Sequence, residues 1–181
     1  MEPGSPEIDV ASFSCPAPLR DRPLVVMGHG GGGGLSHDLL EHVFLPAFGN
    51  PVLDRLGDSA VLDLARPLAG GGRLAFSTDS YVVRPLVFPG GSIGELAING
   101  TVNDLACAAA RPVALALALI LEEGLPLATL RKMLDSAART AREAGAEVIC
   151  GDTKVVERGS ADGMFINTAG IGVIEDGRAL G

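Results

Sequence analysis

Four aspartates stand beside apolar segments, at positions where they could hold a metal ion: Asp58, Asp79, Asp104 and Asp152. Asp79 and Asp152 end stretches predicted to be strands, Asp58 precedes one, and Asp104 lies in the first turn of an expected helix. Taken singly, each is explained as a cap or turn residue, a common position for aspartate. If they converge on one cleft, their hard oxygen ligands suit Mg²⁺ bound to a nucleotide phosphate.

Lys154 adds a positive charge to the same region, two residues after Asp152. The chain has only one other lysine, Lys132, on the exposed side of an expected helix. A lysine beside an aspartate and a glycine turn is a suitable point charge for a phosphate, although a solvated loop cation explains it equally well.

A glycine run at 28–34 lies between an expected strand and an expected helix. It contains Gly-x-Gly-x-x-Gly, but a dinucleotide site also needs an acidic strand end about 20 residues on, and the turn at 46–51 stands there instead. A Walker loop is excluded because no Gly-Lys-Ser/Thr follows. A flexible linker stays open. We favour a phosphate loop of a non-Walker type, because backbone N–H groups before a helix can bind phosphate.

The segment Gly90–Gly94 matches the Gly-x-Ser-x-Gly pattern of α/β-hydrolases around Ser92. That fold places its histidine after the serine, whereas all three histidines here precede it. We therefore interpret Ser92 as a helix cap in a Ser-x-x-Glu box with Glu95. A second box, from Thr101 to Asp104, is expected to restart the helix after Gly100.

Composition excludes several classes of protein. The 181 residues carry a net charge of −8 and no Trp, which argues against nucleic-acid binding because a basic patch is expected there. Charged residues interrupt every apolar stretch before it reaches membrane-spanning length. Cys15, Cys107 and Cys150 cannot all pair and show no zinc spacing, so a reducing, cytoplasmic compartment fits best. Cys107 and Cys150 are expected to be small buried hydrophobes.

Hydrophobic spacing predicts strands that alternate with helices. The expected strands are 24–27, 60–64, 73–78, 113–121, 146–150 and 164–174. The expected helices begin at Ser36, Ser92 and Pro126 and end near Pro46, Ala110 and Gly145. The nine apolar residues at 113–121 predict a strand buried on both faces. The pattern indicates one layered α/β (α+β) domain over 23–181 after a flexible tail at 1–22.

Several stretches together resemble one known family. They are His29–Gly33 with Asp38–Leu40, Phe76–Val83, Phe88–Gly91, Gly100–Ala106, Ile120–Gly124, Gly151–Val156 and Asp162–Thr168. In this order they resemble the HypE hydrogenase maturation factors, within the wider family of aminoimidazole ribonucleotide synthetase-like (PurM-like) ATP-binding proteins. The resemblance covers nearly everything from Met27 to Gly172. The lysine after Gly-Asp-Thr and the long glycine run favour HypE over other members.

The resemblance implies a fold and an activity. The fold is a PurM-like N-terminal domain, a mixed sheet with helices on one face that pairs into a barrel in a homodimer, with ATP near the seam. The activity is the ATP-dependent dehydration of an S-carboxamide on a C-terminal cysteine to a thiocyanate, for the cyanide ligands of nickel–iron hydrogenase. The carbamoyl group arrives from HypF, and the product leaves through the HypC–HypD complex.

The resemblance also implies site residues. The implied Mg²⁺ ligands are Asp79, Asp104 and Asp152, with Asp58 where relatives carry an acidic pair whose first member is Gly57 here. The implied ATP-phosphate contacts are Gly30, Gly31, Gly32, Gly33, Gly34, Asn103, Thr153 and Lys154.

The chain departs from the HypE pattern because the second domain and the terminal cysteine are not in its 181 residues. We therefore expect no catalytic residue in it and no complete dehydration by it alone. Two alternatives stay open. One is another ATP enzyme of the superfamily, thiamine-phosphate kinase or selenophosphate synthetase. The other is a non-catalytic dimerisation or docking module.

Overall fold

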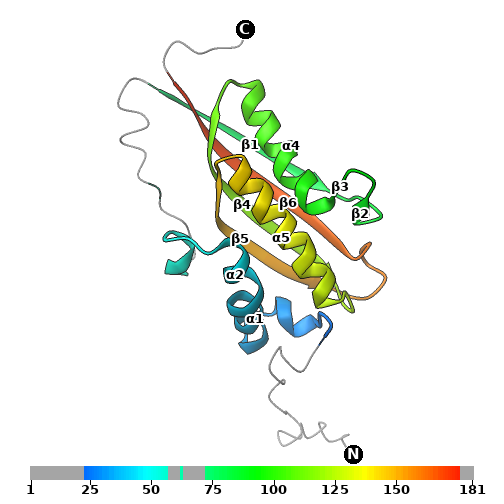
Figure 1. Cartoon of the computed structure of the whole chain (residues 1–181). Coiled ribbons are helices and arrows are strands. Elements are labelled where there is room, and N and C mark those ends of the chain that lie inside the picture. Colours follow the sequence, from blue (N-terminus) through cyan, green and yellow to red (C-terminus); the bar gives the residue numbers. More distant parts are fainter. Residues whose placement is uncertain (1–22, 57–61, 63–71, 176–181) are drawn as a thin grey trace, which may run out of the picture.

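A four-stranded mixed sheet forms the centre of the computed structural model, which describes residues 23–56, 62 and 72–175 (Figure 1). Its strands are β1 (Arg73–Tyr81), β4 (Arg111–Glu122), β5 (Glu147–Val156) and β6 (Met164–Ile174), in the order β1-β6-β4-β5. β6 is antiparallel to both β1 and β4, whereas β4 and β5 are parallel. β1 and β5 are therefore the two edges of this sheet.

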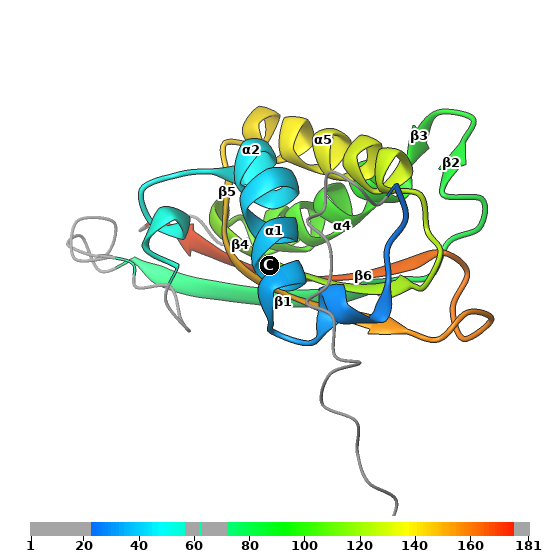
Figure 2. The same ribbon diagram turned by 90° about the horizontal axis from the view of Figure 1, so that it is seen from below.

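Two helices cover one face of the sheet, α4 (Ile93–Cys107) and α5 (Leu127–Glu143) (Figure 2). The cap at Ser92 is confirmed, because its hydroxyl accepts the Glu95 N–H at 3.4 Å. A short hairpin of β2 (Val87–Phe88) and β3 (Gly91–Ser92) leads into α4. The mixed sheet with helices on one face agrees with the expected fold class.

The other face of the sheet carries exposed apolar side chains. Leucines of β4 alternate inward and are buried, whereas Ile120 on the opposite side is 42% exposed. Phe76 of β1 lies on that same side and is 70% exposed. The expectation that 113–121 is buried on both faces is therefore wrong, because the described helices supply only one covering layer.

A helical segment packs along the β5 edge of the sheet. It comprises a 3-10 turn η3 (Met27–Gly30), α1 (Gly34–Leu39), a π-helical turn η4 (Leu40–Phe44), α2 (Leu45–Phe48) and a 3-10 turn η5 (Leu53–Arg55). The expected strand at 24–27 is reduced to a single bridge between Leu24 and Pro126. The helix also passes Pro46, where the sequence predicts its end. Proline is tolerated there because it lies in the first turn of α2.

Three elements have bounds that differ from expectation in ways that move site residues. α4 runs without a break through Gly100, because the Thr101 hydroxyl contacts Thr168 of β6 instead of capping a new helix. Asp104 therefore lies in the last turns of α4. β5 continues to Val156, so Asp152 lies within the strand and does not end it. Asp79 is likewise inside β1, which ends at Tyr81.

Three other expectations concern the cysteines and the unplaced segments. Cys107 is exposed at the end of α4 and Cys150 is half-buried on β5, so neither is a fully buried core residue. The tail at 1–22 and the strand expected at 60–64 lie outside the described residues, apart from residue 62.

The described helices include none that is long and apolar enough to cross a membrane.

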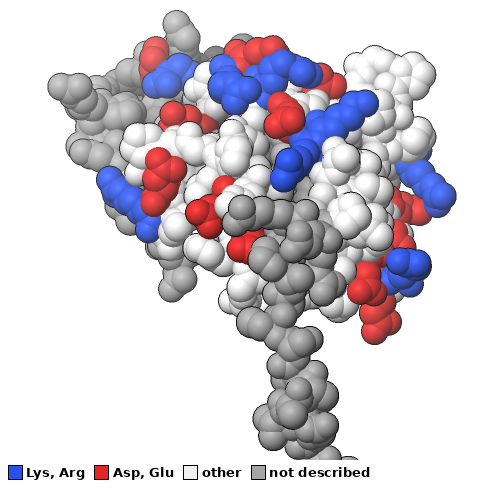
Figure 3. All heavy atoms as spheres, turned by 60° about the horizontal axis from the view of Figure 1, so that its bottom comes forward, with Lys and Arg blue, Asp and Glu red and all other residues white. Residues whose placement is uncertain are grey.

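On the face drawn in Figure 3, acidic and basic side chains are interspersed, with uncharged areas between them.

Candidate functional site

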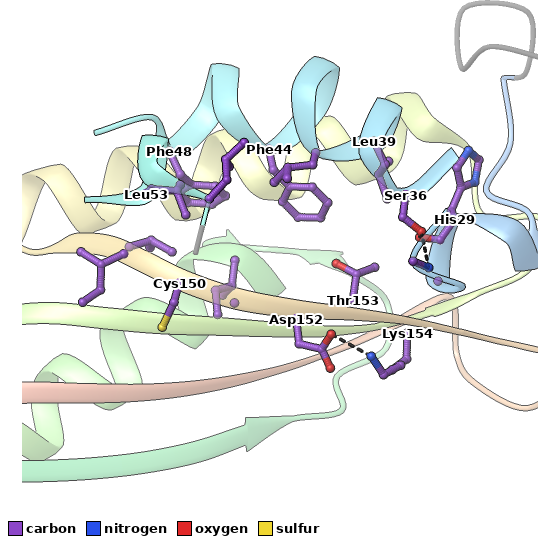
Figure 4. Close-up of a pocket in the computed structure, with 18 of the residues that line it drawn as sticks. His29, Ser36, Leu39, Phe44, Phe48, Leu53, Cys150, Asp152, Thr153 and Lys154 are labelled. Carbon is purple, nitrogen blue, oxygen red and sulfur yellow. Dashed lines mark hydrogen bonds and ion pairs between the residues drawn. The ribbon is translucent and has the colours of Figure 1, made fainter. Parts of the chain in front are cut away.

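A pocket of about 330 Å³ lies between the helical segment and β5 (Figure 4). Its polar end is formed by Gly30, Gly32 and Ser36 on one side and by Asp152–Lys154 on the other. Its other end is apolar and includes Phe44 and Leu53. The pocket therefore brings part of the predicted phosphate loop together with three residues from β5, more than a hundred positions later in the chain.

The glycine run is a packed loop and not a linker. The Ser36 hydroxyl accepts the Gly32 N–H at 2.9 Å and reaches the His29 carbonyl oxygen at 2.8 Å, so it closes the loop. Gly30 lies against β5 so closely that a Cβ there would stand 2.5 Å from the Val155 nitrogen. The sequence predicts that the helix begins at Ser36, whereas α1 begins at Gly34 with Gly33 as its N-cap.

The carboxylate and the ammonium group at the polar end are paired. Lys154 donates to Asp152 at 2.8 Å, and both side chains are more than half exposed. This hydrogen bond from Lys154 lowers the pKa of Asp152, with a further contribution from the Thr153 N–H. Asp152 is therefore ionised at neutral pH and open to solvent.

Two other predicted ligands, Asp79 and Asp104, lie between β1 and α4. Ser77 donates to Asp104 at 2.7 Å, and the Ser80 N–H donates to Asp79 at 2.7 Å. Ser77 was missed in the sequence, although it stands two positions before Asp79 and so shares its face of the strand. Its hydroxyl ties the strand to the helix residue and holds the Asp104 carboxylate in place.

Tyr81 is the last residue of β1 and lies on the same side of the strand as Asp79. Its ring is buried, with the hydroxyl against Gly100 of α4, where no side chain would fit. Burial raises the pKa of Tyr81, and the nearby Asp79 carboxylate acts in the same direction. The Tyr81 hydroxyl therefore stays protonated at neutral pH, and it is buried without a hydrogen-bond partner among the described residues.

The acidic residues do not converge within one copy of the chain. Asp79 and Asp152 belong to opposite edges of the sheet, and three strand spacings of about 4.8 Å place those edges roughly 14 Å apart. Across the part of the chain that the structure describes, no three His, Cys, Asp or Glu side chains form a possible metal cluster. Asp58 falls outside the described residues.

The remaining predicted contacts divide between the two edges. Asn103 is exposed on α4 next to Asp104. Gly31, Gly33 and Gly34 belong to the loop at the β5 edge but do not line the pocket. The predicted site residues therefore form two groups, which we term the acidic half-site (Asp79, Asn103, Asp104) and the loop half-site (Gly30–Gly34, Asp152–Lys154).

The structure is thus an α/β domain with exposed carboxylates at both edges of its sheet and a glycine loop against one of them. Residues 56–174 match the family described as AIR synthase related protein, N-terminal domain. Since this match covers most of the chain, the chain belongs to that family.

Individual relatives are more specific. The chain is 54% identical to "Carbamoyl dehydratase HypE" of Escherichia coli K12 over 83% of its own length and 45% of that protein. It is 51% identical to the protein of the same description from Rhodobacter capsulatus, over 90% and 46%. It thus spans about half the length of the curated relatives it matches.

Solved structures agree with these relatives. A HypE crystal structure in complex with ATP is 49% identical, with a TM-score of 0.80 over 86% of this chain and 45% of that one. A HypE–HypF complex is 47% identical, with a TM-score of 0.58 over 78% and 44%. A thiamine-monophosphate kinase from Stenotrophomonas maltophilia is 20% identical with a TM-score of 0.53, a likeness of fold alone.

Proposed function

We propose that this chain is the nucleotide-binding half of a HypE-type carbamoyl dehydratase in nickel–iron hydrogenase maturation. The reaction is the dehydration of an S-carboxamide on a C-terminal cysteine to a thiocyanate, driven by phosphorylation of the carboxamide oxygen by ATP. The observation that carries the proposal is the identity of about half of the aligned residues with HypE proteins, one of which was crystallised with ATP. HypF and the HypC–HypD complex are its proposed partners. The existence of a HypE–HypF complex supports the first of these.

The chain's own residues are proposed to bind and orient ATP and Mg²⁺. Asp79, Asp104 and Asp152, with Asp58, hold Mg²⁺ through hard carboxylate oxygens, which the exposed and hydrogen-bonded carboxylates of the two half-sites suit. The glycine loop, Asn103, Thr153 and Lys154 contact the phosphates. Phosphoryl transfer asks a protein mainly for positioning and charge neutralisation, and these residue types provide both.

A second copy of the chain is proposed to complete the site. The open face of the sheet carries Phe76, Leu74 and Ile120, which are 70%, 51% and 42% exposed and suit burial against an identical face. Two such faces pair into a closed barrel, in which the β5 edge of one copy meets the β1 edge of the other. The loop half-site of each copy then meets the acidic half-site of its partner, with ATP at the seam.

The test of nucleotide binding is calorimetry with Mg²⁺-ATP on the wild-type chain and on Asp79→Asn. We expect binding to the wild type and its loss in the variant, because one ligand carboxylate becomes a neutral amide. The control is Asp135→Asn, the same chemical change at an exposed position of α5. It should bind ATP as the wild type does. Equal ATP affinity for Asp79→Asn and the wild type contradicts the proposed site.

The test of the shared site is complementation between two inactive variants. Asp79→Asn and Asp152→Asn, each unable to bind ATP alone, are co-expressed with different tags. In a two-fold dimer with shared sites, random assortment restores about a quarter of the sites, because each mixed dimer has one intact site. If each site lies within one chain, co-expression restores none.

The second candidate function is a docking and dimerisation module without nucleotide chemistry. The HypE–HypF complex and the exposed apolar sheet face favour it. A chain that dimerises and binds HypF but binds no ATP at millimolar concentration would fit this function and exclude the first.

A further inference from the structure

A second groove lies between the β2–β3 hairpin, the start of α4 and the outer side of α5 (Figure 1). Its volume is about 690 Å³, and it shares no lining residue with the pocket at the β5 edge. The hairpin contributes the apolar side chains of Val87, which is 45% exposed, and Phe88. Ala128 and Met133 line the groove from α5. One wall of the groove is therefore apolar and open to an incoming segment.

The charged side chains of α5 give this groove an excess of positive charge. Arg131, Lys132 and Asp135 line it and are exposed. A third cation, Arg139, pairs with Glu95 of α4. Within the part of the chain that the structure describes, no acidic side chain pairs with Arg131 or Lys132. The unpaired lining charges are therefore two cations and one carboxylate, in a protein whose net charge is −8.

The first described residues lie at one end of the same groove. The Leu127 N–H donates to the Pro23 carbonyl oxygen at 2.9 Å, and Leu24 forms a bridge with Pro126. Ala128, the next residue of α5, already lines the groove. The 22 residues that precede Pro23 are thus joined to the rest of the protein beside the groove.

The amino-acid sequence of that preceding segment complements the groove. Residues 1–13 carry three acidic side chains and no lysine or arginine. Two of the acids, Glu7 and Asp9, alternate with Ile8 and Val10, and Phe13 follows. In an extended chain successive side chains point to opposite sides. Such a segment presents carboxylates on one side and aliphatic groups on the other, which matches a groove with cations and an apolar wall.

The segment is also long enough to reach along the groove. An α-helix rises about 1.5 Å per residue, so Ala128 and Arg139 lie roughly 16 Å apart along α5. The chain between Asp9 and Pro23, extended at roughly 3.3 Å per residue, spans up to about 45 Å. The two acids can therefore meet the two unpaired cations of the same chain without displacing Pro23 from α5.

We propose that the segment at 7–13 docks in this groove as an extended strap. Glu7 and Asp9 pair with Arg131 and Lys132, while the apolar side chains of the strap pack on the hairpin around Phe88. Because η3 and the glycine loop follow shortly after Pro23, the docked strap restrains the start of that loop. The contact lies within one chain and buries the apolar wall that the described residues leave open.

The first test is a charge reversal with rescue. The chain contains no tryptophan, so Phe13→Trp provides a single fluorophore in the strap. We expect its emission to shift to longer wavelength when Arg131→Glu and Lys132→Glu are added, because the released ring meets water. The shift should disappear when Glu7→Lys and Asp9→Lys are added as well, since the charges are then complementary again.

The matched control is the pair Arg55→Glu and Arg111→Glu, two reversals at exposed positions outside the groove. These changes should leave the emission of Phe13→Trp where it was. The same emission with and without the reversal in α5 overturns the inference. A shift that the two added lysines do not reverse also overturns it.

The second test identifies the occupant of the groove. Cys107→Ser and Cys150→Ser leave Cys15 as the only cysteine, and a maleimide–benzophenone photo-cross-linker is attached to it. We expect cross-links to residues 87–92 or 128–139, in a product with the mass of one chain. Cross-links to these residues in a product of two chains would assign the groove to the segment of a second copy. Cross-links only outside them would leave the groove to a different partner. Each of these last two results overturns the proposal.

Discussion

At the scale of single residues, close packing distinguishes glycines that a sequence shows as one uniform run. Gly30 touches the backbone of β5, whereas a Cβ on Gly33 would meet nothing within 4 Å. Composition therefore cannot say which glycine is required, because the reason lies in a strand more than a hundred residues away. The same contact places the loop beside Asp152 and Lys154.

This difference predicts a matched pair of variants. Gly30→Ala forces its Cβ to 2.5 Å from the Val155 nitrogen, so we expect a loss of about 1–3 kcal/mol in unfolding free energy. Gly33→Ala should change stability by less than about 1 kcal/mol in either direction, since its site is open. Urea unfolding of both variants measures the difference, and equal stabilities would contradict the described contact.

The Asp152–Lys154 pair predicts a small dependence of stability on pH. Because the pKa of Asp152 is lowered in the folded chain, its contribution is present above the unfolded pKa and is lost as pH falls through the folded pKa. We expect Lys154→Met to lose at most about 0.5–1 kcal/mol at pH 7, since the pair is exposed. Below the folded pKa of Asp152 the two chains should unfold alike. A difference that persists in acid would assign the loss to packing.

At the scale of elements, Asn50 joins the turn after α2 to the sheet. Its side chain donates to the carbonyl oxygens of Phe48 and Val148 and accepts the N–H groups of Val52 and Leu53, so all of these bonds depend on one buried amide. Pro51 and the turn beside it were visible in the sequence, but the bond to β5 was not.

We expect Asn50→Ala to release the helical segment from β5. Removing the amide leaves buried backbone groups unpaired, at a cost of about 1–3 kcal/mol in unfolding free energy. Hydrogen exchange should rise most in 34–56 and along 147–150. Asn103→Ala, at an exposed position on α4, is the control for the change in unfolding free energy. Uniform faster exchange over the whole chain would show that Asn50 serves the global fold and not this contact.

At the scale of the whole molecule, the open sheet face is the basis of the proposed dimer. Only one side of the sheet is covered by the described helices, and Phe76 projects from the other side with most of its surface exposed. An apolar face of this kind is costly in water unless another surface buries it. The strand order separates the two half-sites within one chain, and in the proposed dimer pairing through this face brings them together.

Phe76→Asp is therefore expected to convert a dimer into a monomer. A charge in the centre of a buried apolar interface has no partner. The free energy of dimerisation is therefore reduced by far more than the loss of one contact. Light scattering at tens of micromolar should show the mass of two chains for the wild type and of one chain for the variant. Leu96→Glu on α4 should remain a dimer. A monomeric wild type at that concentration would contradict the shared site.

Several local features of this protein could be predicted from its amino-acid sequence. The alternation and turn residues around 164–174 predicted β6 to its exact bounds, and Ser92 with Glu95 marked the start of α4. The family resemblance rested on short motifs that are contiguous in the chain. Each of these features depends on residues that are close together in the chain, so the sequence alone is enough to find it.

The relative positions of the predicted site residues became clear from the three-dimensional fold. It separated Asp79 from Asp152 by placing β1 and β5 at opposite edges, and it put Asp104 at the end of α4. In the structure, the described helices also cover only one face of β4. Strand order and helix coverage depend on contacts between segments that are distant in the chain. The free energies of these contacts cannot be read from the spacing of residues within one segment. The aspartates were therefore recognisable as a set from the sequence, and their division into two half-sites was not.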